Sequence, residues 1–396
     1  MQCGRPLLLR QPFAPDAFDQ VILGCVNVIA DEMNPARVAA LRLGMGEAMT
    51  AFTVQINCGS GMQSIDTAYR YIQNGTADLI LAGGAESLSH APLVFSNRAV
   101  AWYGKLFAAR GLGARLEAFL SVRPSFFKPI IGLERGLTDP ITDLNMGQTA
   151  ELVGHMFHVT RRQADEYAAE SQQRLATAQA NGWLTDEVEP AFARDGTLFD
   201  HDDGVRQDST ADTLAKLKPA FERPWGKVTP GNSSQITDGA SWVILASEDA
   251  VKEHKLTPKA VIVDSEWSAL DPSVMGLGPV YCSTAILKRH NLGLGDIELW
   301  ELNEAFAAQV LGCLAAWKDD EFCRDALGLP GAAGTIPRDR LNVDGGAIGA
   351  GHPVGASGNR IVLHLVNAMK RLGYKRGIAT ECIGGGQGGA MLIETV

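Results

Sequence analysis

The segment NCGSGMQSIDTAYRYIQNGTADLILAGG, residues 57–84, decides the fold. It begins with a glycine-rich turn, continues as a helix expected over Ser60–Gln73, and ends in an apolar strand expected over Asp78–Ala82 that runs into two glycines. The pair Asn74–Gly75 ends the helix, since glycine accepts the backbone conformation found after the last helical turn. An earlier apolar strand is expected at Gln20–Ile29. Strands that alternate with a helix in this way are typical of an α/β protein.

The end of the chain repeats this plan. The turn GHPVGASG, residues 351–358, opens a helix that is expected to reach about Leu372. A strand expected over Gly377–Glu381 and a glycine cluster at 384–386 follow. Both halves therefore read as turn, helix, strand and glycines, which predicts an internal duplication. Any two β-α-β units share such an order, so the pattern by itself leaves the simpler alternative open.

A stretch of different composition separates the repeats. Residues 96–228 are rich in arginine, aspartate, proline and polar turns, and include one strong helix expected over Arg161–Asn181. We interpret this stretch as a loop domain inserted into an N-terminal domain, residues 1–248, with a C-terminal domain at residues 249–396. The strands that flank this boundary are expected at Trp242–Ala246 and Ala260–Asp264, and a further strand at Glu298–Trp300.

Composition narrows the function classes. The formal net charge is −10, which argues against nucleic acid and against an anionic membrane as main partners. The seven cysteines are widely spaced without a Cys-x-x-Cys pair, so neither a disulfide framework nor a zinc cage is expected. No apolar run approaches the roughly 18 residues of a membrane span, and no signal peptide is visible. These features predict a cytoplasmic protein with reduced thiols.

Two motifs offer a nucleophile and a base. Cys58 lies in a tight glycine turn at the start of a helix, where free backbone N–H groups and the helix dipole favour a thiolate. A buried cysteine packed in a turn is an equally good interpretation of this motif alone. His352 stands on the second glycine-rich turn and is a candidate general base or oxyanion donor. A loop histidine without a chemical role is the simpler alternative.

Two further motifs offer an acid and a water-binding group. Cys382 ends a strand at Gly384–Gly386, where exposed backbone N–H groups can hold an oxyanion and the thiol can move a proton. The motif NEAF, residues 303–306, presents Asn303 and Glu304 at a strand-to-helix turn, where either side chain can position a water. A core thiol and an ordinary helix cap are the alternatives.

The four motifs together resemble one family, the thiolases, which comprise acetyl-CoA acetyltransferases and 3-ketoacyl-CoA thiolases. The resemblance extends from about residue 20 to the C-terminus and also includes LAGGAES (81–87), MGQTAE (146–151), LAKLKPAF (214–221), TPGNSSQITDGA (229–240) and NVDGGAIGAG (342–351). It implies a duplicated five-layer α-β-α-β-α fold with an inserted loop domain. It also implies acyl-CoA C-acyltransferase activity: ping-pong thiolysis of 3-ketoacyl-CoA, or Claisen condensation of two acetyl-CoA.

The resemblance also implies roles for individual residues. Cys58 matches the acylated nucleophile, His352 the base that activates it, and Cys382 the thiol that moves a proton to or from the second substrate. Asn303 matches the residue that holds a water, which forms one oxyanion hole with the histidine. The backbone N–H groups of Cys58 and Gly384 form the other. No metal or redox cofactor is implied, and coenzyme A is a substrate.

For coenzyme A binding, the resemblance places Ser234 at the pantetheine arm and Arg206 near the nucleotide end. An ordinary solvated charge is the alternative for Arg206. Three departures from the family pattern stand out. The first strand and most of the following helix are missing, Asn145 replaces a histidine that is usual in short-chain members, and the segment between Trp317 and Asn342 is long. The acyl chain length therefore stays open, with a preference for broad 3-ketoacyl substrates.

Two other functions compete with a catalytic thiolase. A carrier-protein-dependent ketoacyl synthase shares the duplicated fold but pairs its nucleophile with two histidines, and here the third position is Cys382. A truncated, non-catalytic thiolase that serves as a complex subunit is disfavoured by four intact catalytic positions, while the missing first strand favours it. The resemblance further suggests a homodimer or homotetramer, and possible membership of a fatty-acid oxidation complex.

Overall fold

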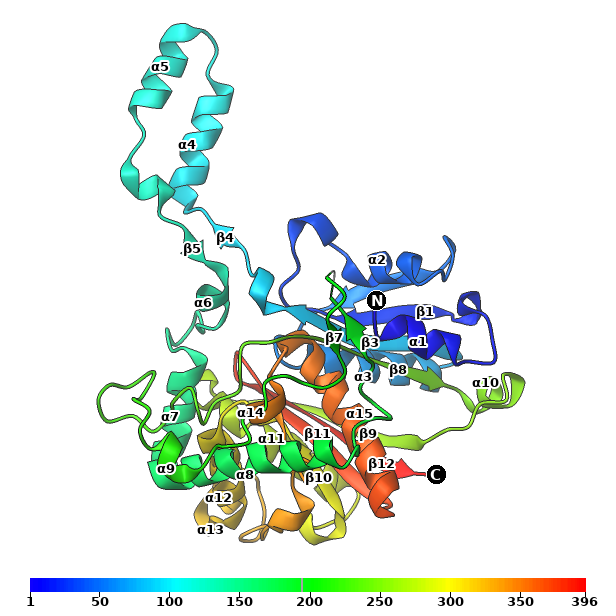
Figure 1. Cartoon of the computed structure of the whole chain (residues 1–396). Coiled ribbons are helices and arrows are strands. Elements are labelled where there is room, and N and C mark those ends of the chain that lie inside the picture. Colours follow the sequence, from blue (N-terminus) through cyan, green and yellow to red (C-terminus); the bar gives the residue numbers. More distant parts are fainter. Residues whose placement is uncertain (194) are drawn as a thin grey trace.

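The computed structural model describes residues 1–193 and 195–396 and contains two four-stranded sheets (Figure 1). The first sheet has the order β2 (Thr50–Val54), β1 (Gln20–Gly24), β3 (Leu79–Ser87), β8 (Asp238–Ala246). The second has the order β10 (Leu299–Leu302), β11 (Arg376–Ile383), β12 (Gln387–Thr395), β9 (Ala260–Ala269). In each sheet a parallel pair is followed by an antiparallel strand.

Helices form the other three layers. The glycine-rich turns open α3 (Ser60–Gln73) and α15 (Val354–Leu372), which pack against each other between the two sheets. One outer face is covered by α1 (Gly4–Leu9) and α2 (Pro35–Arg42), and the other by α11 (Gly278–Arg289) and α12 (Ala307–Lys318). This is the predicted five-layer α-β-α-β-α arrangement.

Matching hydrogen bonds support the duplication. The carboxylate of Asp19, just before β1, accepts the backbone N–H groups of Asp78 and Leu79 at 2.7 and 2.8 Å. In the second half, the carboxylate of Glu298, just before β10, accepts those of Lys375 and Arg376 at 2.8 and 3.0 Å. An acidic side chain thus starts the parallel strand pair in the same way in both sheets.

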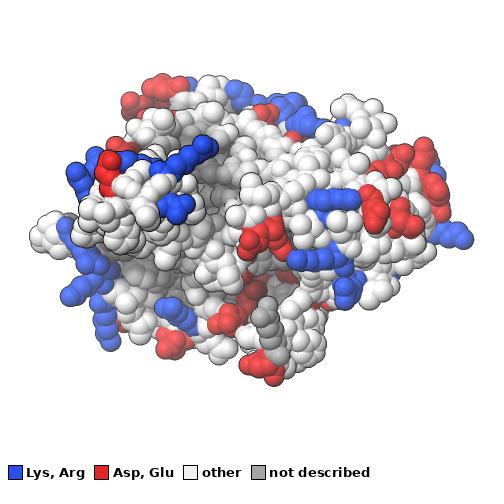
Figure 2. Space-filling view, turned by 90° about the horizontal axis from the view of Figure 1, so that it is seen from above, with Lys and Arg blue, Asp and Glu red and all other residues white. Residues whose placement is uncertain are grey.

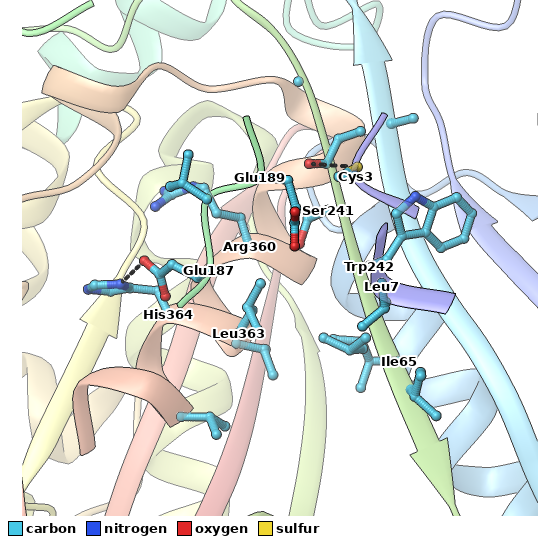
Figure 3. A pocket seen from close by; sticks show the side chains of 18 of the residues that line it. Cys3, Leu7, Ile65, Glu187, Glu189, Ser241, Trp242, Arg360, Leu363 and His364 are labelled. Atoms are coloured by element: carbon cyan, nitrogen blue, oxygen red, sulfur yellow. Dashed lines mark hydrogen bonds and ion pairs between the residues drawn. The ribbon is translucent and has the colours of Figure 1, made fainter. Parts of the chain in front are cut away.

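The two sheets differ at one edge. In the second half, β9 pairs antiparallel with the outer edge of β12, from Ala260–Thr395 to Ala269–Gln387. In the first half, no strand among the described residues pairs with the outer edge of β8. A cavity of about 2350 Å³ lies there, bordered by Trp242 of β8 and by Arg360 and His364 of α15 (Figure 3). The domain boundaries and the missing first strand remain predictions.

Several strands begin or end at other residues than predicted. The strand expected over Gln20–Ile29 stops at Gly24, because the Glu86 carboxylate accepts the N–H groups of Val26 and Asn27 at 3.1 and 2.9 Å and draws the chain out of the sheet. Conversely, β3 continues through its two glycines to Ser87, and β8 begins four residues before Trp242. The ladder between these two strands explains both extensions.

The inserted stretch has two parts. Its first part projects from the body as a helical hairpin formed by α4 (Asn97–Ala108) and α5 (Leu112–Leu120) (Figure 1). Its second part, with α7 (Met146–Met156) and α8 (Arg161–Ala180), packs on the C-terminal half. The remaining short elements are β4 (Leu93–Val94), β5 (Ile130–Ile131), α6 (Gly132–Gly136), β6 (Ala191–Phe192), β7 (Leu198–Phe199), α9 (Ala211–Leu214), α10 (Glu248–Glu253), α13 (Asp320–Asp325) and α14 (Ala347–Ala350). Among the described helices, none is both long enough and apolar enough to span a bilayer.

A buried charge cluster ties the inserted stretch to α15. Nδ1 of His364 lies 2.7 Å from Glu187, and its Nε2 lies 3.6 Å from Glu301 and 3.5 Å from Asp344. The Glu187 and Glu301 charges raise the pKa of His364 to about 9 although burial opposes this shift. Burial also raises the pKa of Glu301 to about 7.

This cluster predicts a pH-dependent stability. Because the folded pKa of His364 exceeds its unfolded value of about 6.5, its stabilisation is complete below that value and is lost as pH rises through 9. The raised pKa of Glu301 acts in the same direction at lower pH. We expect urea unfolding to show a loss of about 2 kcal/mol between pH 6.5 and 10. His364→Gln should flatten this dependence, while the exposed His201→Gln should not. An unchanged slope in His364→Gln would contradict the assignment.

Candidate active site

The candidate catalytic residues meet where two strands end and two helices begin. Asn303 follows β10 and its N–H donates to Thr380 of the parallel strand β11 at 2.9 Å, two residues before Cys382. The first turns of α3 and α15 touch through their backbones, since a Cβ on Gly61 would lie 2.7 Å from the amide nitrogen of Asn359. This contact brings the turns that carry Cys58 and His352 to the same place.

The turn around Cys58 is held from both sides. Asn57 has a left-handed backbone (φ 47°), and its amide donates to the Gly384 carbonyl at 2.7 Å. The Ser60 hydroxyl accepts the Ile56 N–H at 2.9 Å and donates to the Asn57 carbonyl at 2.7 Å. Cys58 is therefore positioned by its own turn and by the glycine cluster after β11.

The electrostatics of Cys58 correct one expectation. Burial raises the pKa of the Cys58 thiol to about 11. Hydrogen bonds from the backbone amides of Gly384 and of Cys58 itself lower the pKa, as expected for a turn at a helix start, but by less than burial raises it. The resting thiol is therefore protonated near neutral pH, and its attack needs a base. The two amides donate toward the sulfur. An oxyanion that develops on a carbonyl group bound to this sulfur can accept both of their hydrogen bonds.

Cys382 lies at the end of β11 and is fully buried. It packs with Met275 and Ala305 and against Met146 and Phe306. Burial holds the pKa of its thiol well above the usual range, and the nearby Cys58 charge raises the pKa further. The two thiols thus share one desolvated site, and only one of them can easily carry a negative charge at a time.

His352 is a neutral imidazole in this site. Its Nδ1 lies 2.6 Å from the hydroxyl of Ser357, which donates to the Pro353 carbonyl at 3.1 Å. A hydroxyl has one proton to give, so this geometry assigns a proton to Nδ1 and leaves Nε2 free to accept one. Burial and the Arg360 charge lower the pKa of His352 to about 4. His352 can therefore act as a base across the neutral range.

Asn303 stands beside the imidazole. Its amide nitrogen lies 3.5 Å from both ring nitrogens of His352. Its Oδ1 is buried and has no hydrogen-bond partner among the described residues. A buried acceptor without a partner is costly, and an ordered water would satisfy it.

Glu304 has a structural role and does not position a water, which its motif had suggested. Its carboxylate accepts from the Tyr167 hydroxyl at 2.8 Å, the Ser171 hydroxyl at 2.5 Å, the Asn342 amide at 3.0 Å and the Ile348 N–H at 3.3 Å. These donors use both oxygens, so Glu304 is not available to position a water. It joins α8 of the inserted stretch to the loops that carry Asn303 and His352.

We therefore expect Glu304→Ala to destabilise the fold by about 3 kcal/mol, because four buried donors would lose their acceptor. Chemical unfolding followed by circular dichroism measures this change. Glu321→Ala, an exposed position in α13, is the matched control and should change stability by less than about 0.5 kcal/mol. Equal stabilities of the two variants would show that the Glu304 network is not structural.

The two residues predicted to bind coenzyme A both lie in loops. Ser234 is half-buried, and its N–H donates to the Ala305 carbonyl at 3.0 Å. Arg206 is exposed, and its N–H donates to Gln172 at 2.8 Å. Gln235 connects the two regions, because its side chain donates to Gly204 at 2.7 Å and its carbonyl accepts the His352 N–H at 3.2 Å.

In the described part of the chain, one group of side chains has metal-ligand spacing: Glu151, His155 and Glu222. Both oxygens of Glu151 accept the N–H of Lys227 at 2.8 Å, and one also accepts that of Val228 at 2.8 Å. The carboxylate therefore holds the loop around residue 227, and these residues lie outside the candidate active site.

Sequence reasoning missed two features of this site and a cavity outside it. It did not identify Ser357 as the partner of His352, although Ser357 stands in the first turn of the helix that follows the histidine. Asn145, singled out as a departure, is the N-cap of α7 and accepts the Gln148 N–H at 3.0 Å. The large cavity beside β8 is separate, because Cys58, His352, Asn303 and Cys382 do not border it.

The chain is similar to known proteins over almost its whole length. The chain matches the model of the thiolase N-terminal domain over residues 2–249 and that of the thiolase C-terminal domain over residues 256–395. It is 38% identical over 384 residues to the β-ketoadipyl-CoA thiolase of Pseudomonas aeruginosa, covering 96% of this chain and 88% of the relative. It is 35% identical over 394 residues to a probable acetyl-CoA acyltransferase of Staphylococcus epidermidis, covering 98% and 90%. The solved human mitochondrial 3-ketoacyl-CoA thiolase in complex with CoA is 36% identical, with a TM-score of 0.84 and coverage of 100% and 90%.

Proposed function

Because the chain belongs to the thiolase family and is an acetyl-CoA C-acyltransferase, we propose that it cleaves 3-ketoacyl-CoA through an acyl-Cys58 intermediate. The observation that carries this proposal is the arrangement around Cys58: two backbone amides donate to its sulfur, the Cys382 thiol is close enough to feel its charge, and the contact between α3 and α15 brings the turn of His352 to the same place. A ketoacyl synthase would need a second histidine in place of Cys382.

In the first half-reaction, the Cys58 thiol loses its proton to Nε2 of His352 and attacks the 3-keto carbon. The bond between C2 and C3 breaks, and the electron pair leaves on C2 of acetyl-CoA. Cys382 protonates this carbon, and the acyl group stays on Cys58 as a thioester. Cleavage through an enolate-like transition state needs stabilisation of the developing charges on oxygen.

In the second half-reaction, the thiol of coenzyme A gives a proton to the Cys382 thiolate and attacks the acyl-Cys58 carbonyl. The carbon–sulfur bond to Cys58 breaks, acyl-CoA leaves, and the free thiol is restored with the proton from His352. Protons and electron pairs balance in this ping-pong scheme, so it requires no metal and no redox cofactor. The Claisen condensation of two acetyl-CoA is the reverse path.

Two oxyanion sites fit this scheme. The N–H groups of Cys58 and Gly384 receive the oxygen of the group bound to Cys58. Asn303, through a water on its unpartnered Oδ1, and His352 receive the thioester oxygen of acetyl-CoA. We propose that the loop domain covers coenzyme A, with Ser234 at the pantetheine arm and Arg206 toward the nucleotide.

We further propose broad 3-ketoacyl specificity. The names of similar proteins support a substrate with a 3-keto group: β-ketoadipyl-CoA thiolase and 3-ketoacyl-CoA thiolase. A homodimer or homotetramer in the cytoplasm, alone or within a fatty-acid oxidation complex, is our expectation for the assembly, and light scattering measures its mass.

The test follows the acyl-enzyme and the substrate range together. Incubation with 3-ketoacyl-CoA in the absence of free coenzyme A should add one acyl group to the peptide containing Cys58, detected by mass spectrometry. Addition of coenzyme A should remove it. Steady-state thiolysis of acetoacetyl-CoA and of a long-chain 3-ketoacyl-CoA then measures specificity. Thiolysis without a label on Cys58 would contradict the proposed intermediate, and activity on acetoacetyl-CoA alone would contradict broad specificity.

A further inference from the structure

The turn between β11 and β12 consists of three glycines, Gly384, Gly385 and Gly386. It carries the Gly384 N–H, which donates to the Cys58 sulfur and which the proposed mechanism uses in an oxyanion hole. Gly385 and Gly386 have left-handed backbones, with φ values of 91° and 80°. Glycine has the greatest backbone freedom of all residues, and this turn has no side chains with which to fix itself. The Gly384 amide therefore has to be held by groups outside the turn.

Two backbone carbonyls of this turn accept hydrogen bonds from other segments. On the β12 side, the Gly386 carbonyl accepts the N–H of Leu270, which follows β9, at 2.8 Å. On the β11 side, the Gly384 carbonyl accepts the side-chain amide of Asn57 at 2.7 Å. Asn57 thus holds the same residue whose N–H donates to the nucleophile that follows Asn57 in the chain.

The backbone of Asn57 is itself fixed by the start of α3. Its carbonyl accepts the Ser60 N–H at 3.1 Å and the Ser60 hydroxyl at 2.7 Å. Its φ of 47° lies in the left-handed region, which asparagine enters more easily than most residues and glycine enters freely. Glycine has no side chain to donate, and an ionised aspartate offers only acceptors. Asparagine therefore combines this backbone conformation with an N–H group for the Gly384 carbonyl.

The contact between Asn57 and Gly384 joins two neutral groups. Charged side chains of both signs are spread over the face of the protein that is seen from above (Figure 2). The two segments that meet at the nucleophile, residues 56–61 and 382–388, contain no charged residue. A neutral amide can hold the glycine turn without placing a fixed charge beside Cys58, which changes between thiol, thiolate and thioester during the proposed reaction.

We infer that Asn57 is a positioning residue of the oxyanion hole, because it sets the place of the Gly384 N–H relative to the Cys58 N–H. The inference rests on the proposed thiolase mechanism, in which these two amides receive the oxygen of the group bound to Cys58. Oxyanion donors stabilise a transition state because they are in place before the charge develops. A displacement of about 1 Å in an active site can cost about 10²-fold in rate.

The experiment compares Asn57→Gly with the wild type in two acyl transfers. Glycine keeps the left-handed backbone and removes only the side-chain amide. We expect kcat for thiolysis of acetoacetyl-CoA to fall about 10²-fold, with KM within about threefold of the wild-type value. Acetyl transfer from acetyl-CoA to Cys58, followed by mass spectrometry, should fall by a similar factor, because its tetrahedral intermediate uses the same two amides.

The alkylation rate of Cys58 separates positioning from a loss of structure. The Gly384 N–H lowers the pKa of the Cys58 thiol, so a displaced amide leaves the thiol less acidic. Alkylation by iodoacetamide at a fixed pH of about 9 should therefore be slower in Asn57→Gly than in the wild type. A loosened fold would instead expose the thiol and accelerate alkylation.

Asn57→Asp is a second variant that tests the donated hydrogen bond itself. Its carboxylate cannot donate to the Gly384 carbonyl, whereas its protonated form can. The ratio of the wild-type rate to the Asn57→Asp rate should therefore decrease as pH falls from about 8 to about 5. A purely structural defect would give a ratio that does not follow the protonation of this side chain.

Asn291→Gly is the matched control, because Asn291 also has a left-handed backbone (φ 55°) but is exposed just after α11. It should keep the wild-type kcat and alkylation rate. Thiolysis by Asn57→Gly within about threefold of the wild type would overturn the inference, as would a loss in KM alone or faster alkylation. If wild-type Cys58 were never acylated, the mechanism itself would fail; acylated wild type with an unimpaired Asn57→Gly contradicts only the role of Asn57.

Discussion

Cys58→Ala abolishes thiolysis of 3-ketoacyl-CoA, with an expected loss on the order of 10⁴-fold or more. The thiol is the proposed acyl acceptor at the head of α3, because the neighbouring Ser60 hydroxyl is engaged with the Ile56 N–H and the Asn57 carbonyl. The alanine variant should fold normally, because the turn is held by Asn57 and Ser60 rather than by the sulfur. Loss of absorbance of the 3-ketoacyl-CoA enolate on addition of coenzyme A measures the rate.

A second thiol provides the control for this prediction. Cys323→Ala removes a buried cysteine of α13 that is distant in the chain from the four motifs, and should leave the rate within about twofold. Unfolding midpoints of both variants separate a chemical loss from a structural one. Comparable rates for Cys58→Ala and wild type would show that Cys58 is not the nucleophile.

The protonation state of the Cys58 thiol gives a further prediction for the wild-type enzyme. Since burial raises the pKa of Cys58 to about 11, its thiolate fraction is small at pH 7 and increases as pH rises toward that value. Alkylation of Cys58 by iodoacetamide should therefore accelerate from pH 7 to 10 without reaching a plateau. A plateau below pH 8 would show that the two amides lower the pKa more than burial raises it.

Short-range patterns made most of the site predictable. Glycine turns before helices identified Cys58 and His352, and the strand ends identified Asn303 and Cys382, because these patterns determine local backbone structure. The order of turn, helix, strand and glycines also predicted the duplication, which the matching contacts of Asp19 and Glu298 support. Family resemblance then assigned roles that the patterns alone left open.

Long-range packing decided what the sequence could not show. Whether Cys58 is more or less acidic depends on how deeply α15 and β11 bury it, and no local motif reports that depth. The four donors of Glu304 come from α8, from the loop at Asn342 and from α14, so its structural role emerges only in the folded chain.

Replacement of Cys382 should affect the two half-reactions of the enzyme to different extents. We expect Cys382→Ala to lower thiolysis on the order of 10³-fold, since it removes the group that moves a proton at C2 of acetyl-CoA. Transfer of an acetyl group from acetyl-CoA to Cys58 breaks no carbon–carbon bond. There Cys382 gives its proton only to the leaving thiolate of coenzyme A, which can also take a proton from water, so this transfer should continue within about tenfold of the wild-type rate. Mass spectrometry of the Cys58 peptide over time measures this transfer.

This split follows from the shared environment of the two thiols. A charge on Cys58 raises the pKa of Cys382, so the second thiol ionises with more difficulty while the first is a thiolate. Acylation turns Cys58 into an uncharged thioester and removes that repulsion, so Cys382 ionises more readily and is available as a thiolate at the stage when it must act on the second substrate. If Cys382→Ala slowed acetyl transfer and thiolysis equally, the residue would serve the nucleophile or the packing around Met275 and Ala305. If only thiolysis falls, Cys382 is the acid and base of the carbon–carbon step.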